Sequence, residues 1–352
     1  MKTEHPLARH WQQPQPLLSL VLYPLARLFG AISWLRRTLY HRAWLKSEHL
    51  PVPVVVVGNL HAGGTGKTPI TAALALALQQ RGIMIGIVSR GYGRSGRDTH
   101  VLSPSSTAAD AGDEPLLLYR QTHAPVAVAA RRADAARALL ARHPDIQIII
   151  SDDGLQHYAL HRDVEMVVFP AADAHRRPDL LPNGALREPL SRLHSVDAII
   201  FSQAESNHTA AAFPLPAAVF HSQLRPAAPY RFRHPADTVQ AHTLPSNASC
   251  AAACAIARPE RFFHTLQQMG FPIHQTHIQA DHSALHPATL PQADYVFITE
   301  KDAVKLPANS PDNIWVLPVR AEISPDLADF VLNKLSICGN TTHIVHHTDT
   351  QS

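Results

Sequence analysis

The chain reads PVPVVVVGNLHAGGTGKT from Pro51 to Thr68. Its β-branched run, bounded by proline, predicts a buried strand of a parallel sheet. Pro69 follows the Gly-Lys-Thr triplet at the expected first turn of a helix, a position that proline favours. Strand, glycine-rich loop, Gly-Lys-Thr and helix in this order are the context of a P-loop. The segment therefore predicts a fold that binds a nucleoside triphosphate.

The loop residues have separate roles in binding phosphate. Glycine lets backbone N–H groups approach phosphate oxygens without a Cβ clash, and the helix N-terminus adds its dipole. Lys67 can reach the β- and γ-phosphates, and the Thr68 hydroxyl can ligate Mg²⁺. His61 stands where the common pattern has its first glycine, so three later glycines form the loop. The predicted nucleotide-binding residues are Gly63, Gly64, Thr65, Gly66, Lys67 and Thr68.

Two other predicted strands end in charged residues. The apolar strand over 145–150 leads to Asp152 and Asp153, a pattern with which P-loop enzymes hold their metal. The strand over 83–89 runs into the Gly- and Arg-rich segment 90–97, which is either a ligand-binding loop or a flexible surface loop. Both strand ends are expected at the sheet edge where α/β folds bind ligands.

Residues taken singly give weaker signals. Asp113 and Glu114 stand at the start of a predicted helix, where carboxylates commonly satisfy free N–H groups. His282 alone is compatible with an ordinary loop histidine. Arg187 lies between prolines and apolar residues, which suggests a fixed loop. From these residues alone, structural roles are favoured over catalytic ones.

Composition limits the class of protein. Of the 352 residues, 45% are apolar, and 31 basic residues nearly balance 28 acidic ones. This balance gives no reason to expect a nucleic-acid partner, and no obligate protein partner is evident. The three cysteines suggest no disulfide framework and fit a reducing compartment.

The pattern predicts an α/β fold: a P-loop NTPase-type, mostly parallel sheet flanked by helices, with a second smaller α/β domain and an N-terminal amphipathic helix. The strand pattern starts again from about residue 211, after an Ala- and Pro-rich linker. The expected divisions are the N-terminal helix, the P-loop domain, the smaller domain and a disordered tail, over 1–48, 49–210, 211–338 and 339–352.

The first helix has an apolar stripe flanked by cations. Apolar residues recur at helical spacing over 16–46, no acidic residue lies between Glu4 and Glu48, and Pro24 is expected to bend or divide the helix. Arg27 interrupts the apolar run too early for the roughly 20 residues of a spanning helix. The composition favours a helix in the headgroup layer of an anionic leaflet. A helix packed on its own domain is the alternative.

Taken together, the motifs resemble those of one family. They are VGNLHAGGTGKTP, SRGYGRSG, GDEP, DDGLQH, LREPLSRL, the Asp281-His282 pair and TEKDAVKL, in this order between about residues 20 and 335. The chain in this respect is similar to the tetraacyldisaccharide 4′-kinases of lipid A biosynthesis. That family's loop does not need glycine at the position of His61.

The resemblance implies an activity. It implies a lipid kinase that uses ATP and Mg²⁺ to phosphorylate the 4′-hydroxyl of a tetraacyldisaccharide 1-phosphate, which gives lipid IVA. It also implies a peripheral or monotopic enzyme on the cytoplasmic face of the bacterial inner membrane, where the lipid substrate lies.

The resemblance also implies residue roles. Asp113 would be the general base and His282 its partner, and Arg187 would lie near the transferred phosphate. Asp152 and Asp153 would lie near the metal with Thr68. Tyr92 and Arg94 would lie near the substrate head group.

Two other classes use the same motifs. A P-loop switch or metallochaperone-type GTPase is the first, but the segment Thr299–Asp302 lacks the spacing of the usual guanine-reading motif. A membrane scaffold with a relic P-loop is the second, and the intact Lys67, Thr68 and Asp152 argue against it.

Overall fold

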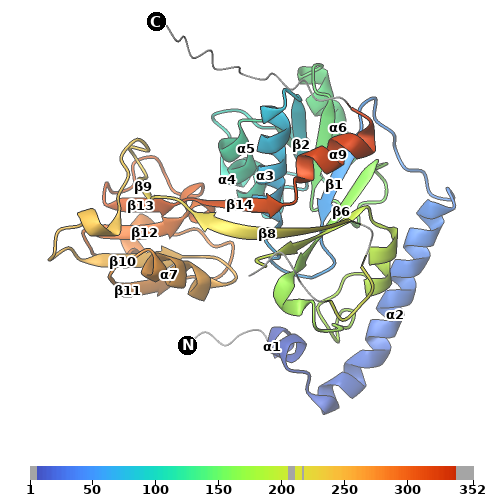
Figure 1. Ribbon diagram of the computed structural model, residues 1–352, viewed down its shortest axis with the longest axis horizontal. Helices are drawn as coiled ribbons and strands as arrows, with labels where there is room; N and C mark the ends of the chain where they lie inside the picture. Colours follow the sequence, from blue (N-terminus) through green and yellow to red (C-terminus); the bar gives the residue numbers. More distant parts are fainter. Residues whose placement is uncertain (1–5, 205–210, 216–217, 338–352) are drawn as a thin grey trace, which may run out of the picture.

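Two β-sheets organise the chain (Figure 1). The computed structural model describes residues 6–204, 211–215 and 218–337. The larger sheet has nine strands, in the order β14 (Val319–Ser324), β8 (Ala218–Pro226), β7 (Ala198–Ser202), β6 (Val164–Pro170), β1 (Val54–Gly58), β5 (Ile148–Asp152), β2 (Ile85–Ser89), β4 (Val126–Val128) and β3 (His100–Val101). The two edge strands, β14 and β3, are antiparallel to their neighbours, and the other pairs are parallel.

The smaller sheet has five strands, in the order β11 (Ile273–Ile278), β10 (Cys250–Cys254), β12 (Tyr295–Thr299), β13 (Ile314–Leu317) and β9 (Tyr230–Arg231). Only β9 is antiparallel to its neighbour. We call residues 230–317 the small lobe, and the nine-stranded sheet with its covering helices the large lobe. The predicted α/β fold is confirmed.

The helices divide between the lobes. In the small lobe they are α7 (Pro259–Gln268) and α8 (Glu300–Ala303). Those of the large lobe and the N-terminal segment are α1 (Pro6–Gln12), α2 (Pro16–His41), α3 (Lys67–Gln80), α4 (Ala108–Ala111), α5 (Asp113–Thr122), α6 (Arg132–Arg142) and α9 (Leu327–Leu335). Short 3₁₀ turns occupy Ala171–Asp173, Leu190–Ser195, Ala241–Thr243 and Pro287–Thr289.

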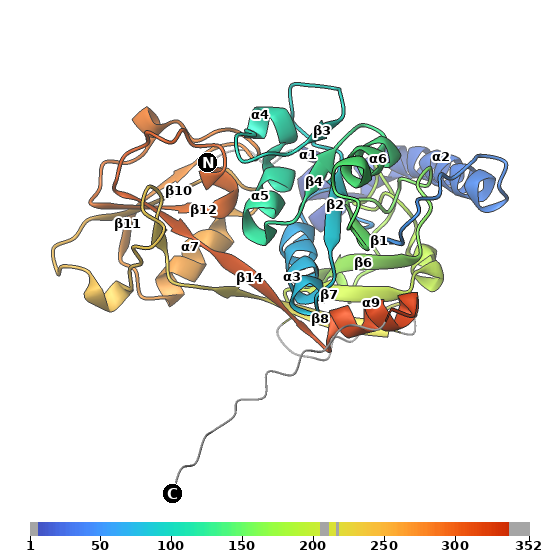
Figure 2. The same ribbon diagram turned by 90° about the horizontal axis from the view of Figure 1, so that it is seen from above.

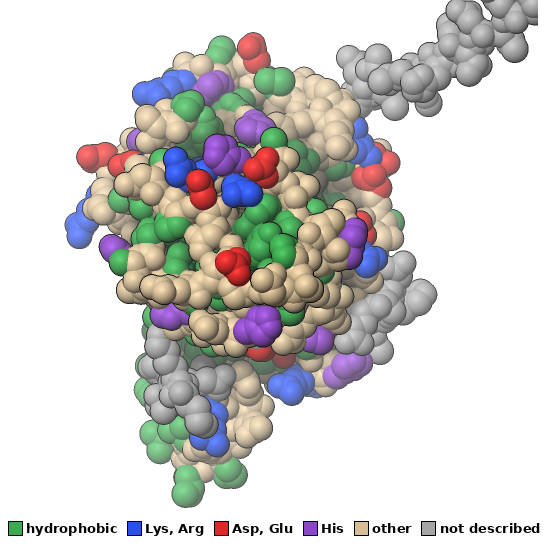
Figure 3. Space-filling model, turned by 90° about the vertical axis from the view of Figure 1, so that its left-hand side faces the viewer, with side chains coloured by type: hydrophobic (Ala, Val, Ile, Leu, Met, Phe, Trp, Pro, Cys, Tyr) green, Lys and Arg blue, Asp and Glu red, His purple; other side chains and the backbone are tan. Residues whose placement is uncertain are grey.

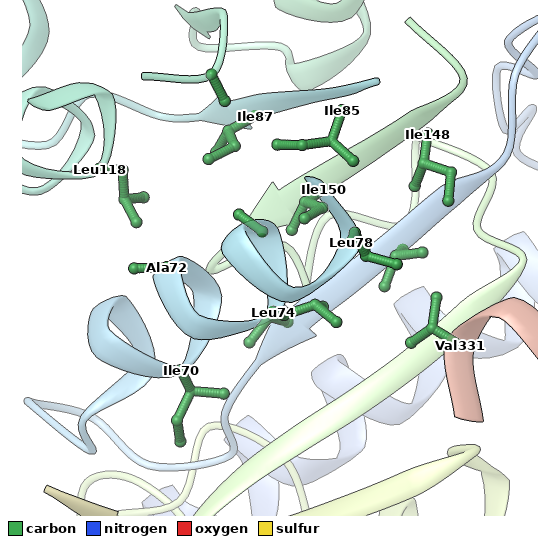
Figure 4. Packing of buried hydrophobic residues seen from close by; sticks show 14 of the residues in the cluster. Ile70, Ala72, Leu74, Leu78, Ile85, Ile87, Leu118, Ile148, Ile150 and Val331 are labelled. Carbon is green, nitrogen blue, oxygen red and sulfur yellow. The ribbon is translucent and has the colours of Figure 1, made fainter. Parts of the chain in front are cut away.

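Strand β1 is buried on both faces, as its valine run predicts. Val55 and Val57 face one hydrophobic cluster, and Val54 and Val56 face another. The first cluster joins α3 and α9 to the sheet through residues labelled in Figure 4, among them Leu74, Leu78, Ile150 and Val331. The second cluster includes residues of α6 and the buried Ala26 of α2. Sheet and helices thus form the rigid base from which the loops at the strand ends project.

A two-stranded ribbon connects the lobes. Strand β14 pairs antiparallel along its whole length with residues 221–226 of β8, and Figure 2 shows the two strands running between the lobes. The chain enters the small lobe after β8 and leaves it before β14. The small sheet is therefore an insertion, and it occupies a narrower range than the 211–338 expected for the second domain. Both ends of that range, including α9, join the large lobe.

Helix α2 runs along the outside of the large lobe (Figure 1). It continues through Pro24 without division. One side is held by the buried Ala26 and by an ion pair between Arg27 and Asp179. The remainder exposes large apolar side chains: Leu17, Leu20, Val21, Tyr23, Leu25, Leu28, Ile32, Trp34 and Leu35. The helix therefore packs on the protein along one stripe and leaves an apolar surface outside.

By length and composition alone, α2 is apolar enough to cross a membrane, although it lies near the N-terminus and little of it is buried. Figure 3 shows hydrophobic side chains exposed at the lower end of the molecule, where Figure 1 places α1 and the start of α2. An interfacial position for α2 stays a prediction. The expected disordered tail over 339–352 lies outside the described residues.

Candidate active site

The P-loop links β1 to α3, and its shape depends on glycine. Gly63 and Gly66 have φ values of 105° and 83°, which an L side chain adopts only with strain. Gly66 caps α3, and no side chain bonds the free N–H groups there. A Cβ added at Gly63 or Gly64 would meet no atom within 4 Å, so the loop borders open space. This cradle of unpaired N–H groups fits a polyphosphate.

Lys67 and Arg187 converge on one carboxylate at the loop. Lys67 Nζ lies 3.4 Å from Asp153 Oδ1, and Arg187 Nη1 lies 3.4 Å from Asp153 Oδ2. Burial opposes the ionisation of Asp153, but the two cations outweigh it and hold the pKa of this carboxyl below its ordinary value. Lys67 is only 9% exposed, so it belongs to the floor of the site. Two cations thus converge on one carboxylate beside the P-loop.

Asp152 occupies the end of β5 and is almost wholly buried. Its Oδ1 accepts a hydrogen bond of 2.9 Å from the Thr71 hydroxyl of α3. Burial, reinforced by the carboxylates of Glu114 and Asp153, raises the pKa of Asp152 to about 7. Acidic groups crowded in this way favour a cation nearby, since a cation offsets their mutual repulsion.

The oxygen donors Thr68, Asp152 and Asp153 fit Mg²⁺ by type. Magnesium prefers oxygen ligands and usually keeps several waters, so one or two carboxylates suffice. No group of three or more His, Cys, Asp or Glu side chains suited to a metal occurs within the described residues. The predicted donors therefore agree with a shared metal–phosphate site and not with an all-protein cage.

Asp113 and His282 come together from different lobes. Asp113 opens α5 after Gly112, and His282 follows β11 in the small lobe. His282 Nδ1 lies 3.2 Å from Asp113 Oδ2. His282 has a φ of 65°, an uncommon left-handed conformation for a non-glycine residue. The ring of Tyr92 meets the His282 imidazole edge-on at a centroid distance of 5.5 Å.

One cavity of about 1190 Å³ contains these groups. The P-loop, Asp153, Arg187, Asp113 and His282 all line it. Phe29, Ile32, Ser33 and Arg36 of α2 also contribute to its wall. The N-terminal helix therefore borders the same space as the phosphate-binding loop.

The predicted substrate residues have different placements. Tyr92 lines the cavity and is largely exposed. Arg94 is not among the lining residues, and its guanidinium donates a 2.9 Å hydrogen bond to the Arg97 carbonyl. Nothing in this geometry directs Arg94 toward a substrate.

Several charged residues of the site were not singled out from the sequence. Lys301 and Lys305 of the TEKDAVKL segment lie beside the Asp113–His282 pair, 3.4 Å from His282 Nε2 and 3.7 Å from Asp113 Oδ2 respectively. Arg132 donates a 3.1 Å hydrogen bond to the Asp153 carbonyl. The two lysines of TEKDAVKL were a usable signal, because they directly follow a predicted strand. Residues at the ends of strands lie at the edge where α/β folds bind ligands.

Comparison with known proteins agrees with this arrangement. The family model described as tetraacyldisaccharide-1-P 4′-kinase matches residues 18–336. A protein named tetraacyldisaccharide 4′-kinase from Neisseria meningitidis serogroup B is 54% identical over 331 residues, which cover 94% of this chain and 95% of the relative. One of the same name from Chromobacterium violaceum is 43% identical, over 94% of this chain and 97% of the relative.

A solved structure gives the same fold. The "apo" form of LpxK from Aquifex aeolicus, crystallised in complex with ATP, superposes with a TM-score of 0.76 at 26% identity. The match covers 91% of this chain and 98% of the solved one.

Proposed function

The chain belongs to the tetraacyldisaccharide-1-P 4′-kinase family, and from this premise we propose how its residues perform the transfer. It is an ATP-dependent lipid kinase that phosphorylates the 4′-hydroxyl of a tetraacyldisaccharide 1-phosphate in lipid A biosynthesis. The product is lipid IVA. The kinase family accounts for the P-loop motifs, so we do not propose the alternative of a P-loop switch or metallochaperone-type GTPase.

Asp113 acts as the general base. The observation that supports this role most is its contact with His282 in the cavity that the P-loop also lines. A sugar hydroxyl must lose its proton as it attacks the γ-phosphorus, and a carboxylate can accept it. Asp113 is the carboxylate that has a histidine at 3.2 Å and a side chain facing the same cavity as Lys67. His282 orients this carboxylate, as the partner residue does in catalytic triads.

Lys67 and Arg187 stabilise the charge of the transferred group. Both now face Asp153, so an incoming phosphate exchanges one anionic partner for another. A cation that already points at the position where charge develops needs little reorganisation during the reaction. The N–H groups of Gly63–Thr68 hold the remaining phosphate oxygens.

Thr68, Asp152 and Asp153 would hold Mg²⁺ beside the phosphates. Bound Mg²⁺ would neutralise charge on the β- and γ-phosphate oxygens. The buried Asp152 is fixed by the Thr71 hydroxyl, which keeps one oxygen oriented. Arg132 fixes Asp153 through its backbone carbonyl.

We propose that the enzyme works at the cytoplasmic face of the inner membrane, with α2 in the headgroup layer. The exposed apolar side of α2 and the exposed cations Arg42 and Lys46 support binding to an anionic leaflet. Phe29 and Ile32 line the cavity from the same helix, so acyl chains could pass from the bilayer along α2 to the site. This arrangement suits a lipid acceptor.

A direct assay tests the activity. Purified enzyme is incubated with ATP, Mg²⁺ and the tetraacyldisaccharide 1-phosphate, and the lipid is analysed by mass spectrometry. We expect one added phosphate on the 4′-oxygen. Failure of the folded wild-type enzyme to add it, or addition at another hydroxyl, would overturn the proposed function. Omission of Mg²⁺ in the presence of a chelator should abolish the product.

A further inference from the structure

The segment after β12 carries two lysines that bracket the Asp113–His282 pair. Lys301 belongs to α8, and Lys305 follows it one turn later. Helix α8 is tied to α5 of the large lobe by Glu300, which accepts a 3.0 Å hydrogen bond from Gln121. The two lysines are therefore fixed relative to both members of the pair.

The Lys305 side chain is only 5% exposed and lies on the Asp113 side of the pair. Its Nζ donates a 2.7 Å hydrogen bond to the Ser283 carbonyl, next to His282. It also lies 3.1 Å from the buried Asp302 and 3.7 Å from Asp113 Oδ2. One ammonium thus secures the His282 loop and faces the oxygen that His282 contacts.

Lys301 covers the other side of the imidazole. Its Nζ lies 3.4 Å from His282 Nε2, 3.2 Å from Asp281 Oδ1 and 3.8 Å from Glu114 Oε1. The ammonium of Lys301 therefore faces one carboxylate from each lobe. Asp281 Oδ2 also faces His282 Nε2, but at 3.8 Å it is beyond hydrogen-bond distance.

The chemistry of lysine then decides the position of the imidazole proton. An ammonium has three donors and no acceptor, so an imidazole nitrogen that it contacts must offer a lone pair. If Nε2 accepts from Lys301, the neutral ring carries its proton on Nδ1. That proton points at Asp113 Oδ2, which must accept it. In this form Nε2 is occupied and cannot take a proton from the substrate.

We propose that Lys301 is a positioning residue that fixes the Nδ1–H tautomer of His282, so that Asp113 and not His282 receives the substrate proton. This inference rests on the proposed function, because it concerns the base of that same transfer. The groups that face His282 are Asp113, Tyr92, Asp281 and Lys301, and Lys301 is the only one of these without an acceptor.

Nuclear magnetic resonance of the imidazole nitrogens tests the tautomer directly. The full-length enzyme is labelled with ¹⁵N-histidine in detergent, and the His282 signals are assigned by their loss in His282→Gln. We expect a protonated Nδ1 and a bare Nε2 in the wild type and in Lys301→Arg. In Lys301→Met, where Asp281 Oδ2 is left facing Nε2, a His282 population protonated on Nε2 should appear beside the Nδ1–H form. A wild type protonated on Nε2, or a tautomer unchanged in Lys301→Met, would overturn the proposal.

Kinetics give the second readout. Lys301→Met should lower kcat by about 10–100-fold, the usual loss when an orienting partner is removed, and Lys301→Arg should restore most of it. The KM for ATP should stay within twofold. Lys334→Met, the same change on an exposed lysine of α9, should leave both tautomer and rate unchanged. If Lys301→Met does not fold, the tautomer of His282 in the wild type still tests the proposal, because protonation on Nε2 would overturn it. A wild type without 4′-kinase activity would refute the proposed function instead, whatever the tautomer.

Discussion

His282 Nδ1 lies 3.2 Å from Asp113 Oδ2, although the two residues are 169 positions apart and belong to different lobes. Their contact depends on how the ribbon of β8 and β14 holds the small lobe against the large one. The proposed base and its partner are therefore brought together by the lobe arrangement and not by either lobe alone. A change in the ribbon could alter catalysis without touching the site.

Replacing the P-loop lysine should remove catalysis and spare the fold. In Lys67→Ala, Arg187 still pairs with Asp153, so the buried carboxylate keeps one cation. We expect kcat to fall by at least about 10²–10³-fold, the loss typical of one charge-stabilising donor. Radiolabel transfer from ATP to lipid measures this, and circular dichroism checks the fold. Wild-type turnover by a folded Lys67→Ala protein would refute the role of the loop.

Asp152 should make the free enzyme less stable as the pH rises. Because burial raises its pKa from 3.8 to about 7, the folded state binds a proton that the unfolded state has lost between these values. By linkage, the free energy of unfolding falls by about 1.4 kcal/mol for each pH unit between pH 3.8 and about pH 7. Above about pH 7 this group causes no further loss of stability. Asp152→Asn, which keeps the contact with Thr71 and cannot ionise, should therefore be more stable than wild type.

Urea unfolding without nucleotide or metal measures this difference. The advantage of Asp152→Asn should be largest at pH 8 and smaller at pH 5, while its kinase activity should be greatly reduced. Asp329→Asn, at an exposed carboxylate of α9, should show no such gain at pH 8. An Asp152→Asn advantage equal at both pH values would contradict the raised pKa.

The cations at the end of α2 should promote binding to anionic bilayers. Arg42→Glu with Lys46→Glu should weaken vesicle binding, since each cation near such a surface contributes about 1 kcal/mol. The loss should be large on vesicles that contain phosphatidylglycerol and small on neutral ones, and it should raise the KM for lipid. Flotation with vesicles of both kinds measures it.

A matched variant controls for net charge. Arg142→Glu with Lys334→Glu makes the same charge change on α6 and α9 instead of just after α2. It should bind anionic vesicles as the wild type does. If both double variants lose binding equally, α2 is not the anchor.

Local patterns in the sequence predicted the strands and the phosphate loop well. The valine run of β1 and the apolar run of β5 needed no information beyond their own residues, because burial on both faces leaves an uninterrupted apolar signal. The P-loop could also be predicted from one short segment, because its strand, its glycines and Lys67 are contiguous in the sequence.

Long-range relations were less accessible. Strand periodicity does not say which sheet a strand joins, so the residues of β8 and β14 fell within the range 211–338 expected for the second domain, whereas both strands belong to the nine-stranded sheet. Pro24 was expected to bend or divide α2, and the helix is not divided there. The positions of Lys301 and Lys305 beside the dyad depend on the docking of α8 on α5, which no periodicity reports. The pairing of Asp113 with His282 came from the family resemblance and not from either residue's surroundings in the sequence.

The central claim is that Asp113 and His282 act as one catalytic unit, and a double-mutant cycle on kcat tests it most directly. Asp113→Asn keeps the size of the side chain but cannot accept a proton at neutral pH, so kcat should fall by about 10²–10⁴-fold with ATP affinity nearly unchanged. His282→Ala should cost as much or less. Because residues that act together are non-additive, the double variant should lose far less than the product of the two single losses. Strictly multiplicative losses would contradict the dyad, even if each substitution alone were damaging.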